Sequence, residues 1–93
     1  MSKINIEYTV QVWQEGNQYI AHAMPLDVMS SGPTPDEART AVDEAVHLFL
    51  VTAIDMGTLD DILVEAGYEL REGNWVGPMW VATERRTTEV GVL

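Results

Sequence analysis

The histidines His22 and His47 are the side chains best suited to bind a metal ion, but they lie far apart in the sequence. A zinc site usually needs two or three ligands at close spacing, such as histidines at positions i and i+4. The two histidines fall on different expected elements. We therefore interpret His22 as a half-exposed strand side chain and His47 as a polar contact on a helix, and we expect no metal site.

Adjacent carboxylates could support acid–base or metal chemistry, and the sequence has two such pairs, at residues 36–37 and 60–61. Both pairs stand at expected helix starts, where negative charge complements the helix dipole. Asp27 stands alone near an expected strand start and is interpreted as a turn residue. Capping and turn formation therefore explain these acids without catalysis.

The other common catalytic patterns are missing from the sequence. Ser30 and Ser31 precede Gly32, but no Gly-x-Ser-x-Gly motif is present, and the chain has no cysteine. No glycine-rich phosphate loop or dinucleotide fingerprint is found. We therefore expect a protein that is not an enzyme and that uses no cofactor.

The charge balance is strongly acidic, with 15 acids, five bases and a formal net charge of −10. Such a chain repels nucleic acids and anionic membranes, which are bound by clustered lysine and arginine. No apolar run is long enough for a membrane span, and we expect a cytoplasmic protein. The acids concentrate in residues 34–66, which leaves two interpretations: a solvated face, or a surface for a basic protein.

The N-terminal third reads as strands joined by turns. Polar and apolar residues alternate from Ile4 to Val12, which predicts a half-buried strand. Turn chemistry at residues 15–17 separates it from a second expected strand at 18–23. Pro25 ends that strand, and residues 27–31 can form a short third one.

A long helix should follow, because Thr34-Pro35-Asp36-Glu37 reads as a capping box with proline at the first helical position. The helix is expected to run to about Met56 and to end at Gly57. The expected core face comprises Ala38, Ala41, Val42, Ala45, Leu48, Phe49, Ala53 and Met56.

The opposite face of this helix ends in an apolar cluster of Leu50, Val51 and Ile54. An exposed apolar cluster must be covered, either by the C-terminal segment or by a second subunit. We predict a homo-oligomer interface at these three residues.

Residues 58–65 should form a short second helix, capped by Thr58 and ended by Gly67. Strands are expected at 68–71 and 74–83, although Gly77-Pro78 suggests a bulge or break. Residues 85–93 should be an edge strand or loose. We predict one α+β domain over 1–93, with a core at 1–67 and a strand-rich C-terminal extension at 68–93. Its order β-β-β-α-(α)-β-β favours an antiparallel sheet with one main helix packed on one face.

Four segments in the stretch from Tyr8 to Tyr68 resemble the HicB-like family when taken in order. They are residues 13–21 (WQEGNQYIA), 25–28 (PLDV), 31–38 (SGPTPDEA) and 43–50 (DEAVHLFL). The family pattern is a hairpin around E-G-x-Y-(I/V)-A, a proline shortly after, a G-x-T-x-(E/D)-E-A helix entry and an E-A-(V/I)-x-L-(F/Y)-L helix. The resemblance covers about two-thirds of the chain.

The resemblance implies a degraded ribonuclease-H-like fold without nuclease activity. It also implies an antitoxin that binds and blocks a small, basic, RNA-cleaving HicA-type toxin. Many family members add a DNA-binding module, but no basic recognition helix follows Tyr68, so the chain is similar to the short, stand-alone members. The residues expected to face the partner are Asp36, Asp43, Glu44 and His47.

Two alternatives remain open at this point. The chain could be an orphan oligomeric domain with a structural or regulatory role and no toxin. It could also be an enzyme or a small-ligand binder that uses a pocket near Trp75 and Trp80, which would require convergent polar groups.

Overall fold

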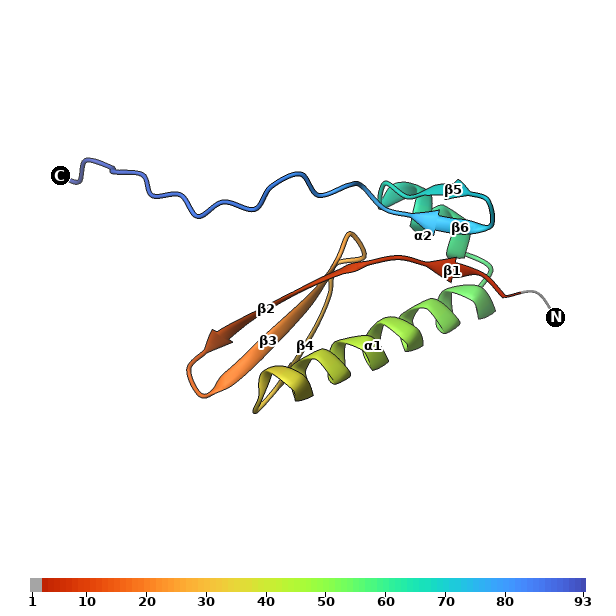
Figure 1. Cartoon of the computed structure of the whole chain (residues 1–93), viewed down its shortest axis with the longest axis horizontal. Coiled ribbons are helices and arrows are strands. Elements are labelled where there is room, and N and C mark those ends of the chain that lie inside the picture. Colours follow the sequence, from red (N-terminus) through yellow and green to blue (C-terminus); the bar gives the residue numbers. More distant parts are fainter. Residues whose placement is uncertain (1–2) are drawn as a thin grey trace.

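The chain folds as α+β, as predicted, with one main helix packed against small sheets (Figure 1). The computed structural model describes residues 3–93, so residues 1 and 2 of the expected domain lie outside the described part. The strands are β1 (Asn5–Ile6), β2 (Thr9–Glu15), β3 (Gln18–Met24), β4 (Val28–Gly32), β5 (Glu69–Arg71) and β6 (Asn74–Val76). The helices are α1 (Pro35–Asp55) and α2 (Leu59–Glu65).

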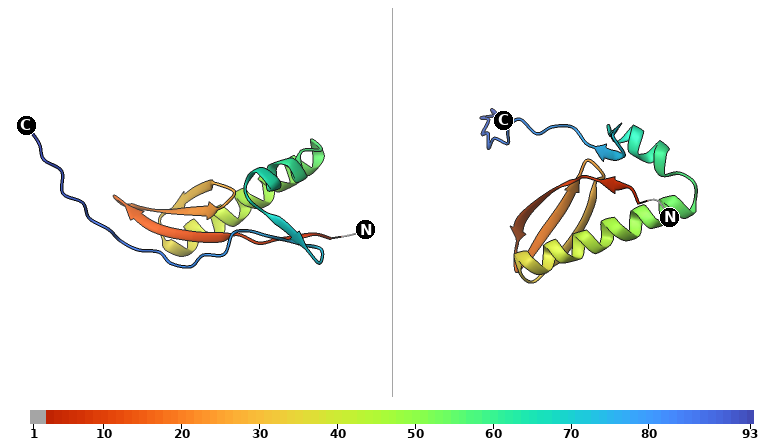
Figure 2. Two further views of the ribbon diagram at one scale, coloured as in Figure 1. Left: turned by 90° about the horizontal axis from the view of Figure 1, so that it is seen from above. Right: turned by 45° about the vertical axis from the view of Figure 1, so that its right-hand side comes forward.

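Strands β2, β3 and β4 form an antiparallel sheet in that order. The turn between β2 and β3 places Glu15 opposite Gln18, and Gly16 adopts a φ of 58°, a conformation that glycine tolerates without a steric penalty. Side chains alternate between the two faces of each strand. Ala21 and Ala23 of the central strand β3 are fully buried and allow α1 to approach closely (Figure 2).

The single sheet expected from the sequence is divided into two. The strand predicted from Ile4 to Val12 is interrupted at Glu7 and Tyr8, and β1 pairs in parallel with β6 in a second sheet of order β1-β6-β5. Two hydrogen bonds stabilise the backbone at this break in the strand. The Glu7 amide donates to the Trp75 carbonyl at 3.0 Å, and the Tyr68 hydroxyl donates to the Glu7 carbonyl. The sequence alternates correctly, but these distant partners divide the strand.

The start of α1 is capped as predicted, with one difference. The Thr34 hydroxyl oxygen accepts a hydrogen bond from the Glu37 amide at 3.1 Å. A full capping box would have the Glu37 carboxylate accept a hydrogen bond from the Thr34 amide. Here the carboxylate instead accepts from the Thr34 hydroxyl at 3.1 Å. The helix ends at Asp55, and Gly57 follows with a φ of 71°, as expected for a helix stop.

The buried face of α1 is rotated from the predicted one. Its buried residues are Ala38, Val42, Val46 and Ala53. The prediction placed Leu48, Phe49 and Met56 in the core, and this was wrong: all three are exposed, Leu48 by 67% and Met56 by 70%. The helix packs mainly on β4 and β3, and in this position Val46 lies in the core while Leu48, Phe49 and Met56 face away from it.

The helix α2 and the C-terminal strands complete the core. Thr58 was predicted to cap α2 but makes no side-chain cap; its hydroxyl donates instead to the Ala53 carbonyl at 3.4 Å. Tyr68 and Trp75 are buried in the same core as α1 and β3. The C-terminal strands are therefore part of the packed body.

The strand predicted for residues 74–83 ends at Val76, and the remainder of that prediction was wrong. Pro78 has no amide hydrogen to offer a neighbouring strand. Gly77 packs closely against Pro25, and a Cβ atom at position 77 would lie only 3.2 Å from the proline ring. Residues 77–93 leave the body as an extended segment without regular secondary structure (Figures 1 and 2).

Candidate functional site: a groove between β1 and α1

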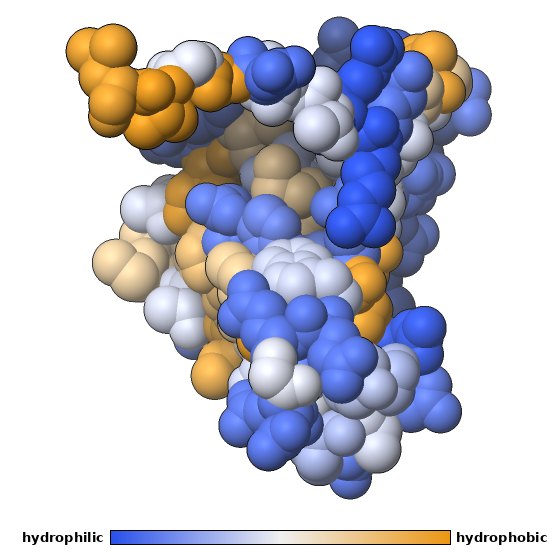
Figure 3. All heavy atoms as spheres, turned by 90° about the vertical axis from the view of Figure 1, so that its left-hand side faces the viewer, coloured by the Kyte–Doolittle hydropathy of each residue, from blue (hydrophilic) through white to orange (hydrophobic). Residues whose placement is uncertain are grey.

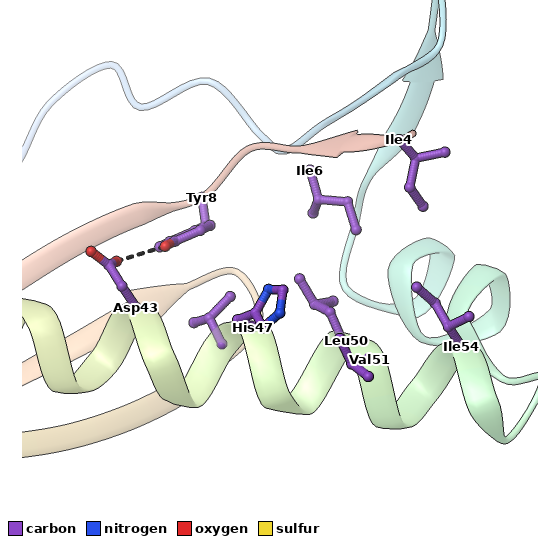
Figure 4. A pocket seen from close by; sticks show the side chains of 9 residues that line it. Ile4, Ile6, Tyr8, Asp43, His47, Leu50, Val51 and Ile54 are labelled. Carbon is purple, nitrogen blue, oxygen red and sulfur yellow. Dashed lines mark hydrogen bonds between the residues drawn. The ribbon is translucent and has the colours of Figure 1, made fainter. Parts of the chain in front are cut away.

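An apolar groove of about 290 Å³ lies between the N-terminal strand and the outer side of α1 (Figure 4). It is partly open to solvent, and Val51 and Ile54 on its α1 side are exposed. The lining residues are Ile4, Ile6, Tyr8, Asp43, Val46, His47, Leu50, Val51 and Ile54.

One wall of the groove comes from alternate residues of the N-terminal segment. Ile6 of β1 and its neighbours Ile4 and Tyr8 point toward α1 (Figure 4). Their period of two puts all three on the same side of an extended chain. The sequence predicted this alternation, but it did not indicate which helix the three side chains would face.

The other wall comes from residues of α1 spaced three and four apart, which share a side of a helix. The structure places Asp43 and His47, predicted to face a partner, beside the predicted oligomer residues Leu50, Val51 and Ile54. Two surfaces treated as separate in the sequence are thus one groove.

The apolar cluster on this side of α1 is partly covered, and not by the C-terminal segment. Leu50 is half-buried beneath β1, because the N-terminal strand crosses it. Val51 remains 39% exposed and Ile54 52% exposed. The N-terminal strand was not considered as a cover in the sequence, and it leaves the far end of the cluster open.

The other two residues predicted to face a partner lie outside the groove. Asp36 forms an exposed ion pair with Arg39 at 2.7 Å, and Glu44 is exposed beside Asp43. Asp36, Asp43 and His47 follow a spacing of seven and four, which aligns them along one side of α1. The exposed acids Asp36, Asp43 and Glu44 are called the acidic stripe of α1, and the stripe reaches the apolar groove at Asp43.

Comparisons with known proteins do not assign this arrangement to a family. No protein-family model matches the chain, and neither a curated protein nor a solved structure matches it.

A hydrogen bond links the two walls of the groove at its acidic end. The Tyr8 hydroxyl donates to the Asp43 carboxylate at 2.6 Å (Figure 4). Burial, the hydrogen bond and the negative charge of Asp43 raise the pKa of Tyr8 from 10.0 to about 12. Tyr8 therefore stays protonated and keeps Asp43 in place at the groove mouth.

A second hollow of about 460 Å³ adjoins the groove at Ile4 and Ile54 and is bordered by Asp60 and Asp61. Across residues 3–93, no three histidine or acidic side chains cluster closely enough to hold a metal ion. Among the same residues, no helix has both the length and the apolar character needed to cross a membrane.

His22 makes a contact that the sequence did not indicate. Its Nε2 lies 2.5 Å from Asp27 Oδ1, and its ring meets the Trp13 ring edge to face at 6.2 Å between centroids. Asp27 has a φ of 60°, which turns its carboxylate back toward β3. The pair joins β3 to the start of β4, so His22 has a structural contact on the sheet surface.

The pocket proposed near Trp75 and Trp80 is not formed by both residues. Trp75 is buried in the core, whereas Trp80 lines a small hollow of about 70 Å³ beside Pro25 and Pro78. The two tryptophans therefore do not share a pocket, as the hypothesis of an enzyme or a small-ligand binder had expected.

The stability of the fold should fall between pH 10 and pH 12. Burial, together with the nearby charge of Glu7, raises the pKa of Tyr68 from 10.0 to about 12. A pKa raised in the folded state adds stability that is complete below pH 10 and is lost as the pH rises through 12. Urea unfolding measured from pH 8 to pH 12 should show this loss.

Tyr68→Phe should reduce the slope of that pH dependence and cost about 1 kcal/mol at neutral pH, because its hydrogen bond to the Glu7 carbonyl is removed. Tyr19→Phe is the control, since no hydrogen bond of the Tyr19 hydroxyl is recorded within residues 3–93. Identical pH profiles for the wild type and Tyr68→Phe would contradict the assignment.

Proposed function

We propose that this chain is a non-catalytic, cytoplasmic, antitoxin-like protein that binds and neutralises a small basic ribonuclease toxin of the HicA type. The resemblance to HicB-like proteins suggests this class of partner. The observation that carries the proposal is the acidic stripe on α1 that continues into an open apolar groove.

The charge on α1 suits a basic partner. The helix has five acids and a single base, Arg39, and its outer acids Asp36, Asp43 and Glu44 are exposed. Opposite charges on two proteins accelerate their encounter and orient it, and the effect weakens with salt. The stripe therefore steers a cationic protein toward the groove.

The groove adds the apolar contact that charge alone does not provide. Stable interfaces combine an apolar centre with a polar rim. Val51 and Ile54 offer exposed apolar surface, while Asp43 and His47 stand at the polar end. A partner side chain seated between them would be held by burial and by charge together.

Neutralisation by this surface needs no chemistry from the chain. A ribonuclease binds the RNA backbone through cationic residues. An acidic protein seated on those residues excludes RNA by occupying the same positions. The proposed role thus agrees with a chain in which reactive side chains are few and scattered.

The test is co-expression with the product of a neighbouring small, basic reading frame, followed by co-purification and an RNA-cleavage assay. Ile54→Asp places a charge in the groove and should abolish capture and restore cleavage. Leu70→Asp is the matched control, because Leu70 is similarly exposed but lies on β5 outside the groove. Equal effects of both variants, or no capture by the wild type, would refute the proposal.

A second candidate function is an orphan oligomeric domain with no toxin. The open apolar residues Val51 and Ile54 favour it, because a second copy could cover them. Absence of any partner, with a solution mass that decreases in Leu50→Asp, would support this alternative over the antitoxin.

A further inference from the structure

The C-terminal segment 77–93 extends away from the body and exposes apolar side chains. The molecule measures 59 Å along its longest axis and only 29 and 24 Å along the others. Val92 is 91% exposed, and Val81, Val90 and Leu93 are also exposed. Figure 3, viewed toward this end, shows a group of hydrophobic atoms that protrudes at the upper left. Residues that are β-branched, such as Thr87, Thr88, Val90 and Val92, favour a strand once a neighbour is available.

The sheet has an open edge of matching length at β2. The order β2-β3-β4 leaves one side of β2 without a neighbouring strand in the described chain. Exposed edges are normally protected by lysine, proline or short length. The seven residues of β2, TVQVWQE, include no lysine and no proline. The three-residue β5, in contrast, has charged residues at both ends.

The apolar end of the tail does not fit the open edge of its own body. Strand β6 pairs with β1 in parallel with Asn5 opposite Asn74, an offset of 69 residues. The same register continued along β2 would place residues 78–84 opposite residues 9–15. Residues 87–93 would then extend past the end of β2, beyond the turn that joins it to β3. The strand β2 of the same copy could therefore not cover Val90, Val92 and Leu93.

We propose that residues 87–93 of one copy add as a strand to the open edge of β2 in a second copy, reciprocally, to form a two-fold dimer. Both segments are seven residues long, and each has two valines two positions apart. In an antiparallel pairing, Val90 and Val92 would lie beside Val12 and Val10, which are half-buried against the core. Neighbouring strands share a face in this way, so the added valines extend the existing core.

The charge distribution favours the tail as the contact between copies. The chain has a net charge of −10, but the side-chain charges of segment 77–93 cancel, and the proposed strand 87–93 has a single charged side chain, Glu89. Two acidic bodies repel each other, whereas a strand with so little charge is repelled much less by either one. The residues of β2 do not line the α1 groove, so this dimer leaves the proposed partner surface free and does not depend on it.

The experiment compares the solution mass of the full chain with that of a chain ending at Arg86. Light scattering should give twice the 10.4 kDa chain mass for the full protein and a single-chain mass after truncation. Hydrogen exchange should show β2 amides that face away from β3 protected in the full chain and exposed in the truncated one. The amides of α1 should stay protected in both, which shows that the truncated chain remains folded.

Point variants refine the assignment without shortening the chain. Val90→Asp with Val92→Asp should separate the dimer, whereas Val81→Asp, exposed in the tail but outside the proposed strand, should leave it intact. A synthetic peptide of residues 85–93 should bind the truncated protein, and the same peptide with both valines changed to aspartate should not.

Three outcomes would overturn the proposal. The first is a full chain that is monomeric, including one whose β2 edge is protected by its own tail. The second is a truncated chain that keeps the mass of a dimer. The third is a dimer that dissociates with Leu50→Asp but not with the tail variants, which would place the contact on α1.

Discussion

Replacing Leu63 by alanine is expected to lower the free energy of unfolding by about 2–5 kcal/mol, because a large side chain is removed from a filled core. Leu63 is 0% exposed and is among the largest fully buried side chains of the described chain. It anchors α2 on the core formed by α1 and the β1-β6-β5 sheet. A domain of this size is stable by only about 5–15 kcal/mol, so the variant should lose a large share of that margin.

Urea unfolding followed by far-UV circular dichroism measures the effect. Val64→Ala is the control, because the neighbouring residue lies on the same helix and is 63% exposed. It should cost less than about 1 kcal/mol, since exposed positions contribute little. Equal losses for both variants would show that α2 is not anchored through Leu63.

The local features of the fold were predictable because a few neighbouring residues determine them. The Thr34 cap, the proline at the first turn of α1 and the turn at Gly16 all depend on contacts within four positions. The alternation from Ile4 to Val12 also placed one set of side chains on one face correctly. Such features need no information about distant segments.

The features that were missed depend on contacts between distant segments. The pairing of β1 with β6 joins residues 5 and 74, and no local pattern encodes it. The helix α1 packs mainly on β4 and β3, and it buries Val46 and leaves Leu48 exposed. The helical period identified an apolar face, but the packing of α1 on these strands determined which of two overlapping faces is buried.

One wall of the candidate groove could be predicted from the sequence and the other could not, because only the first depends on local spacing. The α1 wall could be found from the sequence, since Asp43, His47, Leu50 and Ile54 follow helical spacing. The wall formed by Ile4, Ile6 and Tyr8 could not, because its position depends on the β1–β6 pair. The Tyr8–Asp43 hydrogen bond, which spans 35 residues, had no local signal.

The groove and the β2 edge are two separate surfaces with different chemistry. The groove is mostly apolar, with Asp43 and His47 at its polar end. The β2 edge offers backbone groups and alternating side chains along seven residues. A basic folded protein suits the first surface, and an extended strand with little charge suits the second. Because the two proposed contacts use different residues, the two proposals are compatible with each other and can be tested separately.

Neutralising the acidic stripe with Asp36→Asn, Asp43→Asn and Glu44→Gln should slow association with a basic toxin by about 10- to 1000-fold at low salt, because electrostatic steering accelerates association by that range. The dissociation rate should change less, since the groove contacts remain. Stopped-flow or biosensor kinetics at several salt concentrations would measure both rates. The wild type should lose its advantage as salt rises, because exposed charges are screened.

The control for this variant is Glu65→Gln, Glu69→Gln and Glu72→Gln. It also removes three acids, so the net charge of the chain changes equally. These residues are exposed, and they line neither the groove nor the hollow beside it. If steering depends on the stripe, the control variant should associate nearly as fast as the wild type. Equal slowing in both variants would mean that overall charge attracts the partner, and the acidic face of α1 would then have no special role.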